Sequence, residues 1–255
     1  MTTNDQNDRA AWLHGPPANC SVPPEGDQPR WRLVLLGAPG VGKGTQADLL
    51  HRRLGACHLS TGDVFRAAAR NGLCEPTPAM TSALEYMRRG ELVPDATVWE
   101  MVRERAGCLR CGGGFLLDGF PRTLAQAEAL NRAMQSDKIT LDAVVNYELP
   151  LTDIIARLSG RRVCEKCKAV THVSLQRAGD DGRYHHCGGH LMQREDDRPE
   201  AIAVRMDAYD RSTAPLINFY KGLGLLVPVA ATGSPESICG RTVSALAERT
   251  TRSGR

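Results

Sequence analysis

The feature that most constrains the fold is a glycine-rich segment, residues 37–45 (GAPGVGKGT), which follows a short apolar run and opens a helical pattern. Its GxxxxGK spacing is that of a phosphate-binding loop. Glycines let backbone N–H groups converge on phosphate oxygens, and the dipole of the following helix adds to the attraction. Lys43 supplies a mobile charge for the terminal phosphates, and Thr45 lies near where a hydroxyl would hold Mg²⁺ or a phosphate. The spacing predicts a nucleoside triphosphate site but does not indicate which reaction takes place there.

Short apolar runs alternate with helical patterns along the rest of the chain. The strand-like runs are residues 33–36, 115–117, 143–147 and 225–229, and the helical patterns include 42–53, 123–134 and 200–220. Short buried strands that alternate with helices are typical of a mostly parallel sheet covered on both faces. The predicted fold class is α/β, a phosphate-loop NTPase-type parallel sheet flanked by helices.

Charge and cysteine content narrow the class of molecule. Lys and Arg number 32 against 29 Asp and Glu, so any cationic site must be a local cluster. No apolar stretch reaches the roughly 18 residues of a membrane span. Residues 1–30 are rich in Pro, Asn, Asp and Gly, and we predict a disordered arm there, without a secretory or targeting signal. The nine cysteines are then expected to be reduced or metal-bound, in a cytoplasmic protein.

Residues 160–197 interrupt the alternation of strands and helices. They hold cysteines, histidines, glycines and charges, with few apolar residues. A segment of this composition cannot build a hydrophobic core of its own. It predicts a small inserted subdomain that is held together by something else.

Five motifs, in order, resemble those of the adenylate kinase family. They are residues 37–46 (GAPGVGKGTQ), 59–66 (LSTGDVFR), 114–123 (GFLLDGFPRT), 160–162 (GRR), and 194–197 (REDD) with Arg205 and residues 213–216 (TAPL) after it. The resemblance covers about residues 31 to 250. It implies a core at 31–59, 94–159 and 198–255, a nucleoside monophosphate (NMP) binding arm at 60–93 and a hinged lid at 160–197. It also implies reversible, Mg²⁺-dependent phosphoryl transfer from ATP to AMP, giving two ADP, by a monomer.

The resemblance also implies which residues carry the reaction. Phosphoryl transfer depends on positioning and charge neutralisation, which arginine forks supply. The implied catalytic residues are Lys43, Arg122, Arg161, Arg194, Arg205 and Asp118, the last placed to hold water on Mg²⁺. The implied ATP-binding residues are Gly40, Val41, Gly42, Lys43, Gly44, Thr45, Arg157, Val170, Thr171 and Ser234. The implied AMP-binding residues are Thr61, Arg66, Glu91, Leu92, Val93, Gly119, Phe120, Pro121, Arg122, Gln126, Arg194 and Arg205.

Some of these positions carry finer expectations. Gln126 is expected to contact the AMP base. Thr171 and Ser234 depart from the residues common in the family, which weakens the expected contact with the ATP adenine. Asp196 and Asp197 are expected to anchor the arginines of the lid.

The lid cysteines resemble the zinc knuckles of some adenylate kinases. Cys164 and Cys167 form one pair and Cys187 aligns with the fourth family ligand, whereas the third position holds Tyr184, a poor zinc ligand. A tetrahedral Zn²⁺ can replace the missing core of so small a subdomain. The predicted ligands are Cys164, Cys167, Cys187 and His185, with His186, His190 and His172 as alternatives for the last. Cys108 and Cys111 form a second pair, which we interpret as two thiols without a metal.

Three alternative functions fit the sequence less well. Another base specificity, GTP:AMP or UMP/CMP, is disfavoured by Gln126 and by the long lid. A nucleic-acid-binding module built on the Cys/His segment is disfavoured because that segment has few aromatic residues for base stacking. A non-catalytic nucleotide sensor is disfavoured by the presence of Lys43, Asp118 and the phosphate arginines. We therefore expect ATP, AMP and ADP as ligands, and neither nucleic acid nor membrane as a partner.

Overall fold

The computed structural model describes residues 30–62, 83, 85–104, 113–167, 169–175 and 182–252. The predicted disordered arm falls outside these ranges except for Arg30, and so does most of the predicted NMP arm. Arg66 and the pair Cys108 and Cys111 also lie outside the described residues.

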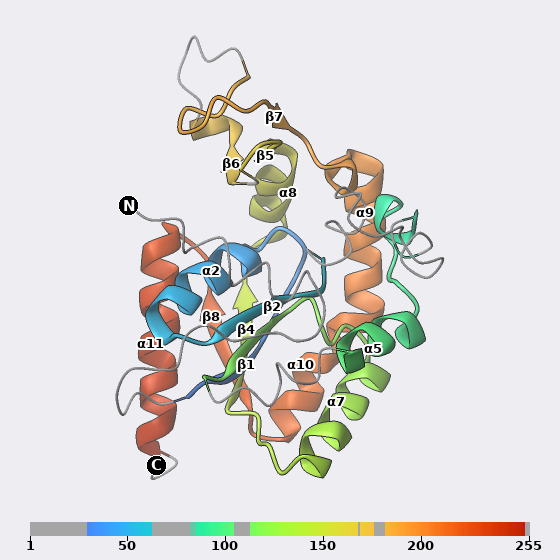
Figure 1. The fold of residues 1–255 in the computed structure, drawn as a ribbon, viewed down its shortest axis with the longest axis vertical. Helices are drawn as coiled ribbons and strands as arrows, with labels where there is room; N and C mark the ends of the chain where they lie inside the picture. Colours follow the sequence, from blue (N-terminus) through green and yellow to red (C-terminus); the bar gives the residue numbers. More distant parts are fainter. Residues whose placement is uncertain are drawn as a thin grey trace.

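A sheet of five parallel strands forms the centre of the molecule, in the order β2-β3-β1-β4-β8 (Figure 1). The strands are β1 (Arg32–Gly37), β2 (Cys57–Ser60), β3 (Phe115–Asp118), β4 (Ala143–Glu148) and β8 (Leu226–Ala230). Four of them match the predicted apolar runs, and the α/β class is confirmed. β2 has no counterpart among the predicted strands, because its sequence CHLS lacks the apolar run that marks the others.

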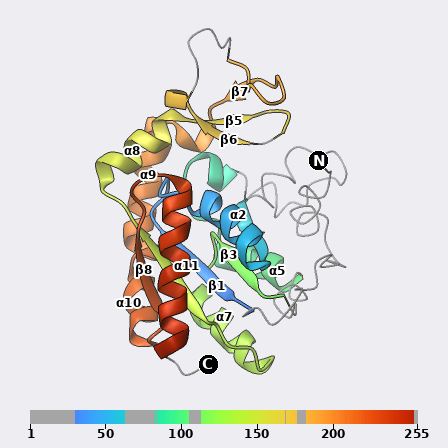
Figure 2. The ribbon, with the colours of Figure 1, turned by 90° about the vertical axis from the view of Figure 1, so that its left-hand side faces the viewer.

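Helices cover both faces of this sheet (Figures 1 and 2). One face carries α2 (Lys43–Leu54) and α11 (Pro235–Arg252), and the other carries α5 (Asp95–Glu104), α7 (Leu124–Ser136) and α10 (Pro215–Gly222). Side chains of a strand point alternately to the two faces, so Leu33 and Leu35 of β1 pack with the first layer and Val34 and Leu36 with the second. No helix in the described ranges has both the length and the hydropathy to cross a membrane.

The predicted helical pattern over residues 200–220 is confirmed, but the regular α-helix breaks within it. The chain forms α9 (Pro199–Ala208), a wider π-type turn η3 (Tyr209–Thr213) and then α10. Ala214 donates its N–H to Tyr209 O, five residues earlier, at 2.8 Å. Pro215 explains the break, because it has no N–H and its ring would clash with the carbonyl of a regular preceding turn. Such widened turns are common at functional sites, and Thr213 Oγ1 donates to Arg122 O at 2.9 Å.

Residues 161–197 build a small sheet of their own beyond α8 (Leu151–Gly160), at the top of Figure 1. Its antiparallel strands are ordered β6-β5-β7, with β5 (Arg161–Cys164), β6 (Val170–His172) and β7 (Leu191–Met192). Short 3-10 turns, η1 (Val173–Leu175) and η2 (Glu195–Asp197), follow β6 and β7. At its base, α8 and α9 pack against each other through Ile154, Leu158 and Ile202.

Candidate active site

The glycine-rich loop joins the end of β1 to the start of α2, as its spacing predicts. Gly42 caps the helix with φ of 104°, a left-handed conformation that favours glycine. No side chain caps this helix end and no acidic residue lies in its first turn. The first N–H groups of α2 and the positive end of its dipole are therefore available to an anion.

Lys43 turns back into this loop. Its Nζ donates to Gly37 O at 2.7 Å and to Ala38 O at 3.0 Å. Burial is the main cause that lowers the pKa of Lys43 to about 7; Asp118 opposes the shift, and three nearby arginines add to it. These arginines are Arg122, Arg205 and Arg161. Burial and the neighbouring arginines both disfavour the charged form of Lys43, and a polyphosphate anion would offset the repulsion among these cations.

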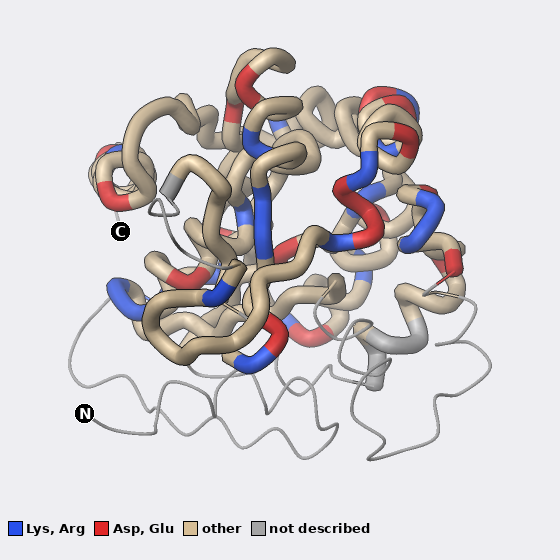
Figure 3. The backbone as a smooth tube through the Cα atoms, turned by 90° about the horizontal axis from the view of Figure 1, so that it is seen from above, with Lys and Arg blue, Asp and Glu red and all other residues tan. Residues whose placement is uncertain are grey.

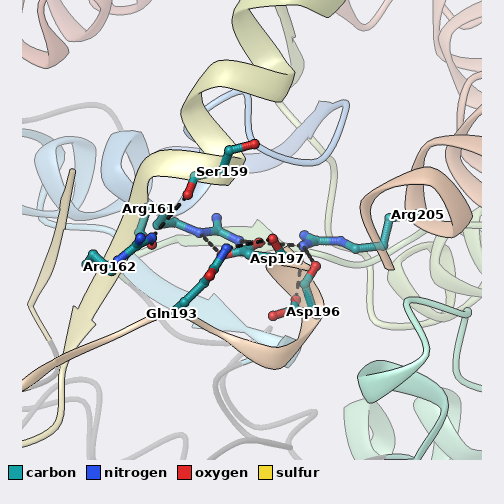
Figure 4. Close-up of polar contacts among 7 residues, drawn as sticks. All are labelled: Ser159, Arg161, Arg162, Gln193, Asp196, Asp197 and Arg205. Carbon is teal, nitrogen blue, oxygen red and sulfur yellow. Dashed lines mark hydrogen bonds and ion pairs between the residues drawn. The ribbon is translucent and has the colours of Figure 1, made fainter. Parts of the chain in front are cut away.

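Two of these arginines are held by one buried carboxylate (Figure 4). Arg161, at the start of β5, donates through Nε to Asp197 Oδ2 at 2.7 Å and through Nη2 to Asp197 Oδ1. Arg205, from α9, donates through Nη1 to Asp197 Oδ1 at 3.0 Å and lies 3.1 Å from Asp196 Oδ2. The Asp197 side chain is fully buried. The predicted anchoring by Asp196 and Asp197 is confirmed for Arg161 and Arg205. Arg194 precedes this carboxylate pair as the N-cap of η2.

A pocket opens beyond the carboxyl ends of β2 and β3. Its lining is partly apolar and partly polar: Thr61, Gly62, Met87, Glu91, Leu92, Val93, Val98, Gly119, Arg122 and Gln126. The predicted AMP residues found there are Thr61, Glu91, Leu92, Val93, Gly119, Arg122 and Gln126. Apolar walls with a few convergent polar groups suit a small ligand such as a nucleotide. Phe120, also predicted, packs into the core below α5 and α7, with Pro121 buried beside it.

The residues predicted for the ATP base come from two places. Arg157 of α8 donates to Val41 O at 3.1 Å and to Ala231 O at 2.8 Å, so its guanidinium joins the phosphate loop to the segment after β8. Ser234, in that segment, accepts from Ser237 N at 3.2 Å at the start of α11. Val170 and Thr171 instead belong to β6, in the small upper sheet.

Comparison with known proteins identifies the family. A family model described as adenylate kinase matches residues 35–225. The adenylate kinase of Carboxydothermus hydrogenoformans is 46% identical over 215 residues, which are 84% of this chain and 99% of that protein. The adenylate kinase of Salinispora tropica is 44% identical over 215 residues, 84% of this chain and 97% of that protein. The chain belongs to the adenylate kinase family. Adenylate kinases are phosphotransferases that act on ATP and AMP, so the predicted enzyme class is confirmed.

Three cysteines of the small antiparallel sheet and its turns come together. The Sγ atoms of Cys164, Cys167 and Cys187 all lie within 4.8 Å of one another, and Cys187 Sγ is 3.3 Å from each of the other two. Gly189 makes room for them, because a Cβ there would lie 2.6 Å from Cys164 Sγ. Burial raises the pKa of the Cys164 thiol, but hydrogen bonds from backbone N–H groups and the neighbouring thiols lower it to about 7. The donor set therefore suits a thiophilic divalent cation.

Histidine is not part of this cluster among the residues that the structure describes. His185 stacks on His186, with ring centroids 4.0 Å apart, and both contact Tyr184. His172 lies at the end of β6, where its ring nitrogens are 2.8 Å from Ser174 Oγ and 3.2 Å from Ala156 O. The backbone of His190 pairs with that of Arg183 in an isolated antiparallel β-bridge.

Tyr184 occupies the position where a fourth cysteine would stand. The two turns that carry these cysteines are built alike: Cys164 donates its N–H to Ala169 O at 2.9 Å, and Tyr184 donates its N–H to Gly189 O at 2.8 Å, five residues ahead in both cases. Cys167 and Cys187 each follow three residues after the first position of their turn. The backbone of the second turn thus matches that of the first, with a phenol in place of one thiol.

Sequence reasoning missed His58, a buried residue of β2. Its Nδ1 is 3.1 Å from Asp48 Oδ1, and its Nε2 is 3.5 Å from Asp118 Oδ2. Burial alone would lower the pKa of His58, but the contacts with Asp118 and Asp48 outweigh it and raise this pKa to about 9. No local pattern marks the residue, because the carboxylates come from α2 and β3 and meet it only through the fold. His58 thus contacts the carboxylate of Asp118 from the neighbouring strand.

We expect His58 to make stability fall as pH rises. The ordinary pKa is 6.5 and the folded pKa about 9, so folding favours the protonated form. The contribution, about 3 kcal/mol, is fully present below pH 6.5 and is lost as pH rises through about 9. Urea unfolding of the ligand-free protein at pH 6 and at pH 10 measures it. Other groups, Lys43 among them, also titrate between these pH values, but alike in both proteins, so His58→Gln should change the difference by about 3 kcal/mol relative to the wild type. An equal difference in both proteins would contradict the assignment.

Proposed function

We propose that the chain catalyses reversible, Mg²⁺-dependent transfer of the terminal phosphoryl group of ATP to AMP, giving two ADP, and so maintains adenine nucleotide balance. One observation carries this: the phosphate loop and the pocket that holds Gln126 share a single group of cations. Lys43 belongs to the loop, Arg122 lines the pocket, and Arg161 and Arg205 lie close enough to shift the pKa of Lys43. Figure 3 looks down on this end of the molecule and shows Lys and Arg positions from several segments around its middle.

This arrangement suits a transfer that needs no protein nucleophile. A phosphate oxygen of AMP attacks the terminal phosphorus of ATP, and the electron pair of the broken P–O bond passes to the ADP that leaves. The protein must hold two anions in line against their repulsion, which the convergent arginines and Lys43 accomplish. Mg²⁺, when bound with ATP, neutralises part of the phosphate charge. We assign Asp118 to hold its water, since this carboxylate lies beside Gly44 in the first turn of α2.

We propose that residues 60–93 and 160–197 move as an NMP arm and a lid on the core. Support comes from the ends of the small sheet. Gly160 closes α8 immediately before β5, and Arg198 and Pro199 begin α9 immediately after η2. Closure over both nucleotides would exclude water and prevent idle hydrolysis of ATP. One chain carries the residues of both proposed nucleotide sites, which supports the further proposal that the enzyme works as a monomer. We also propose that it is a cytoplasmic enzyme.

A coupled assay of ADP production tests the activity and its base specificity together. ATP and Mg²⁺ are held fixed, and AMP, GMP, CMP and UMP are offered in turn. We expect a strong preference for AMP, because Gln126 offers an amide to the base pocket. Preference for another monophosphate would assign a different base specificity within the family. Folded protein that binds ATP but uses none of them would contradict the proposed function.

We infer that the cysteine cluster holds a structural Zn²⁺. Cys164, Cys167 and Cys187 would supply three thiolates, and His185 is proposed for the fourth position, adjacent in sequence to Tyr184. The contact between three thiols in a subdomain without a core supports a metal that holds the lid together. When bound, the ion supplies structure rather than chemistry, because the transfer needs no activated water.

Cys164→Ser is expected to lower both the zinc content and the melting temperature. The wild-type chain should carry about one zinc, and the variant should lose most of it, because Cys164 supplies one of the three thiols that cluster among the described residues. Much activity should survive at low temperature, since the phosphate loop is untouched. Elemental analysis and thermal unfolding measure these effects. Cys239→Ser, which removes a buried thiol from α11, is the matched control and should keep its zinc. Unchanged zinc content in Cys164→Ser would exclude Cys164 as a ligand.

A further inference from the structure

The amide of Gln126 is held by two groups that cannot exchange roles. Its Nε2 donates to Asp95 Oδ1 at 2.6 Å, and its Oε1 accepts from the backbone N–H of Arg122 at 2.8 Å. A carboxylate can only accept and a backbone N–H can only donate. Turning the amide over would place oxygen against oxygen and N–H against N–H. Gln126 therefore has one permitted orientation.

The fixed orientation of the Gln126 amide leaves one donor and one acceptor in defined positions for a ligand. A carboxamide has two N–H groups and two acceptor positions, so one of each remains after these contacts. Gln126 is 4% exposed and lines the pocket beyond β2 and β3, so little solvent competes with a ligand for these remaining groups. Adenine offers an acceptor at N1 and a donor at its 6-amino group, whereas a 6-oxopurine offers a donor and an acceptor at the same positions. A fixed amide can match only one of these patterns, but a freely turning amide can match both.

Asp95 is itself held in place. It is the first residue of α5, and its second carboxylate oxygen accepts from Thr123 Oγ1 at 2.9 Å. Thr123 is the N-cap of α7, where its side chain accepts from Gln126 N at 3.2 Å. The carboxylate thus spans two helices, with one oxygen on the helix cap and the other on the amide. The hydrogen bond of Oδ2 with Thr123 thus helps to keep Oδ1 on Gln126.

We propose that Asp95 determines the base specificity of the monophosphate site by fixing the amide of Gln126. Asp95 is a positioning residue, because it acts through Gln126 rather than on the nucleotide. The inference rests on the proposed function, since it takes the pocket to be the AMP site. It assigns the choice between 6-amino and 6-oxo purines to a residue outside the pocket lining.

Comparison of AMP with IMP isolates this effect. The two nucleotides have nearly the same shape, but the hydrogen-bonding pattern of the base is reversed at positions 1 and 6. We expect Asp95→Ala to lower the ratio of kcat/KM for AMP to that for IMP by about tenfold or more, with the KM for ATP unchanged. Asp95→Ser should behave alike, because a hydroxyl can donate as well as accept and does not fix the amide. It also serves if the alanine variant fails to fold. A ratio within about twofold of the wild type would overturn the proposal.

Thr123→Ala is the matched structural control. It removes the cap of α7 and one contact of Asp95, but it leaves the contact between Asp95 and Gln126. We expect a lower melting temperature with an unchanged ratio for AMP and IMP. A fall in the ratio as large as that of Asp95→Ala would assign the effect to helix packing and overturn the proposal. A folded wild-type protein inactive on both nucleotides would refute the proposed function itself, whereas an active wild type with insensitive variants would refute this inference alone.

Discussion

Lys43→Ala is expected to lower kcat by about a thousandfold or more. The lysine is the cation of the phosphate loop, and Arg122, Arg161 and Arg205 lie around it. Its charge is needed most when negative charge moves between the two nucleotides, so its loss should reduce kcat rather than only raise the KM for ATP. Steady-state ADP production at saturating ATP and AMP measures the loss.

The fold of this variant should remain intact. Lys43 loses two hydrogen bonds to Gly37 O and Ala38 O, but its removal also relieves repulsion among the nearby cations. We expect the free energy of unfolding to change by less than about 2 kcal/mol. Arg53→Ala, at an exposed position in the last turn of the same helix, is the control and should keep full activity. Normal turnover by Lys43→Ala would contradict the role proposed for the loop.

Asp197→Asn is expected to damage stability and activity together. The free energy of unfolding should fall by about 3 to 5 kcal/mol, because the change leaves two arginines facing each other without their buried counter-charge. The amide would also place N–H groups against guanidinium N–H groups. Arg161 and Arg205 would lose their common anchor, so kcat/KM for AMP should fall about a hundredfold. Urea unfolding and steady-state kinetics measure the two effects.

Asp196→Asn is the matched control for that variant. Asp196 precedes Asp197, makes an ion pair with the same Arg205, and retains 16% side-chain exposure where Asp197 has none. Solvent screening should limit its contribution to about 1 kcal/mol or less. Equal losses in the two variants would show that burial of Asp197 does not give it a special role in holding the arginines.

The break in the predicted helix over residues 200–220 shows a local signal that was missed. Pro215 lies inside the pattern, and proline in a helix interior removes a hydrogen bond and crowds the preceding turn. The helical period of the apolar residues concealed this. The wide turn at Tyr209–Thr213 accommodates the proline, and Thr213 in this turn donates to the carbonyl of Arg122.

The cluster of thiols was predictable only in part. The two cysteines of residues 164–167 are close in sequence, so their spacing alone indicates a turn that presents both thiols. Cys187 joins them because β5 pairs with both β6 and β7, which folds this segment back on itself. The spacing of the histidines could not show that His185 and His186 stack on each other and on Tyr184, because stacking depends on side-chain orientation in the folded turn.

The sequence alone specified those parts of this adenylate kinase whose contacts are local. A strand, a glycine-rich loop and a helix follow one another within residues 32–54, and each element is encoded by its own period or spacing. The partners of the site residues, in contrast, lie far from them in the sequence. Asp95 reaches Gln126 across 31 positions, Arg161 reaches Asp197 across 36, and His58 meets Asp118 from a neighbouring strand. Hydrophobic periodicity shows which face of an element is buried but not which element covers it. Only the strand order β2-β3-β1-β4-β8, and the packing of helices on this sheet, bring these side chains together.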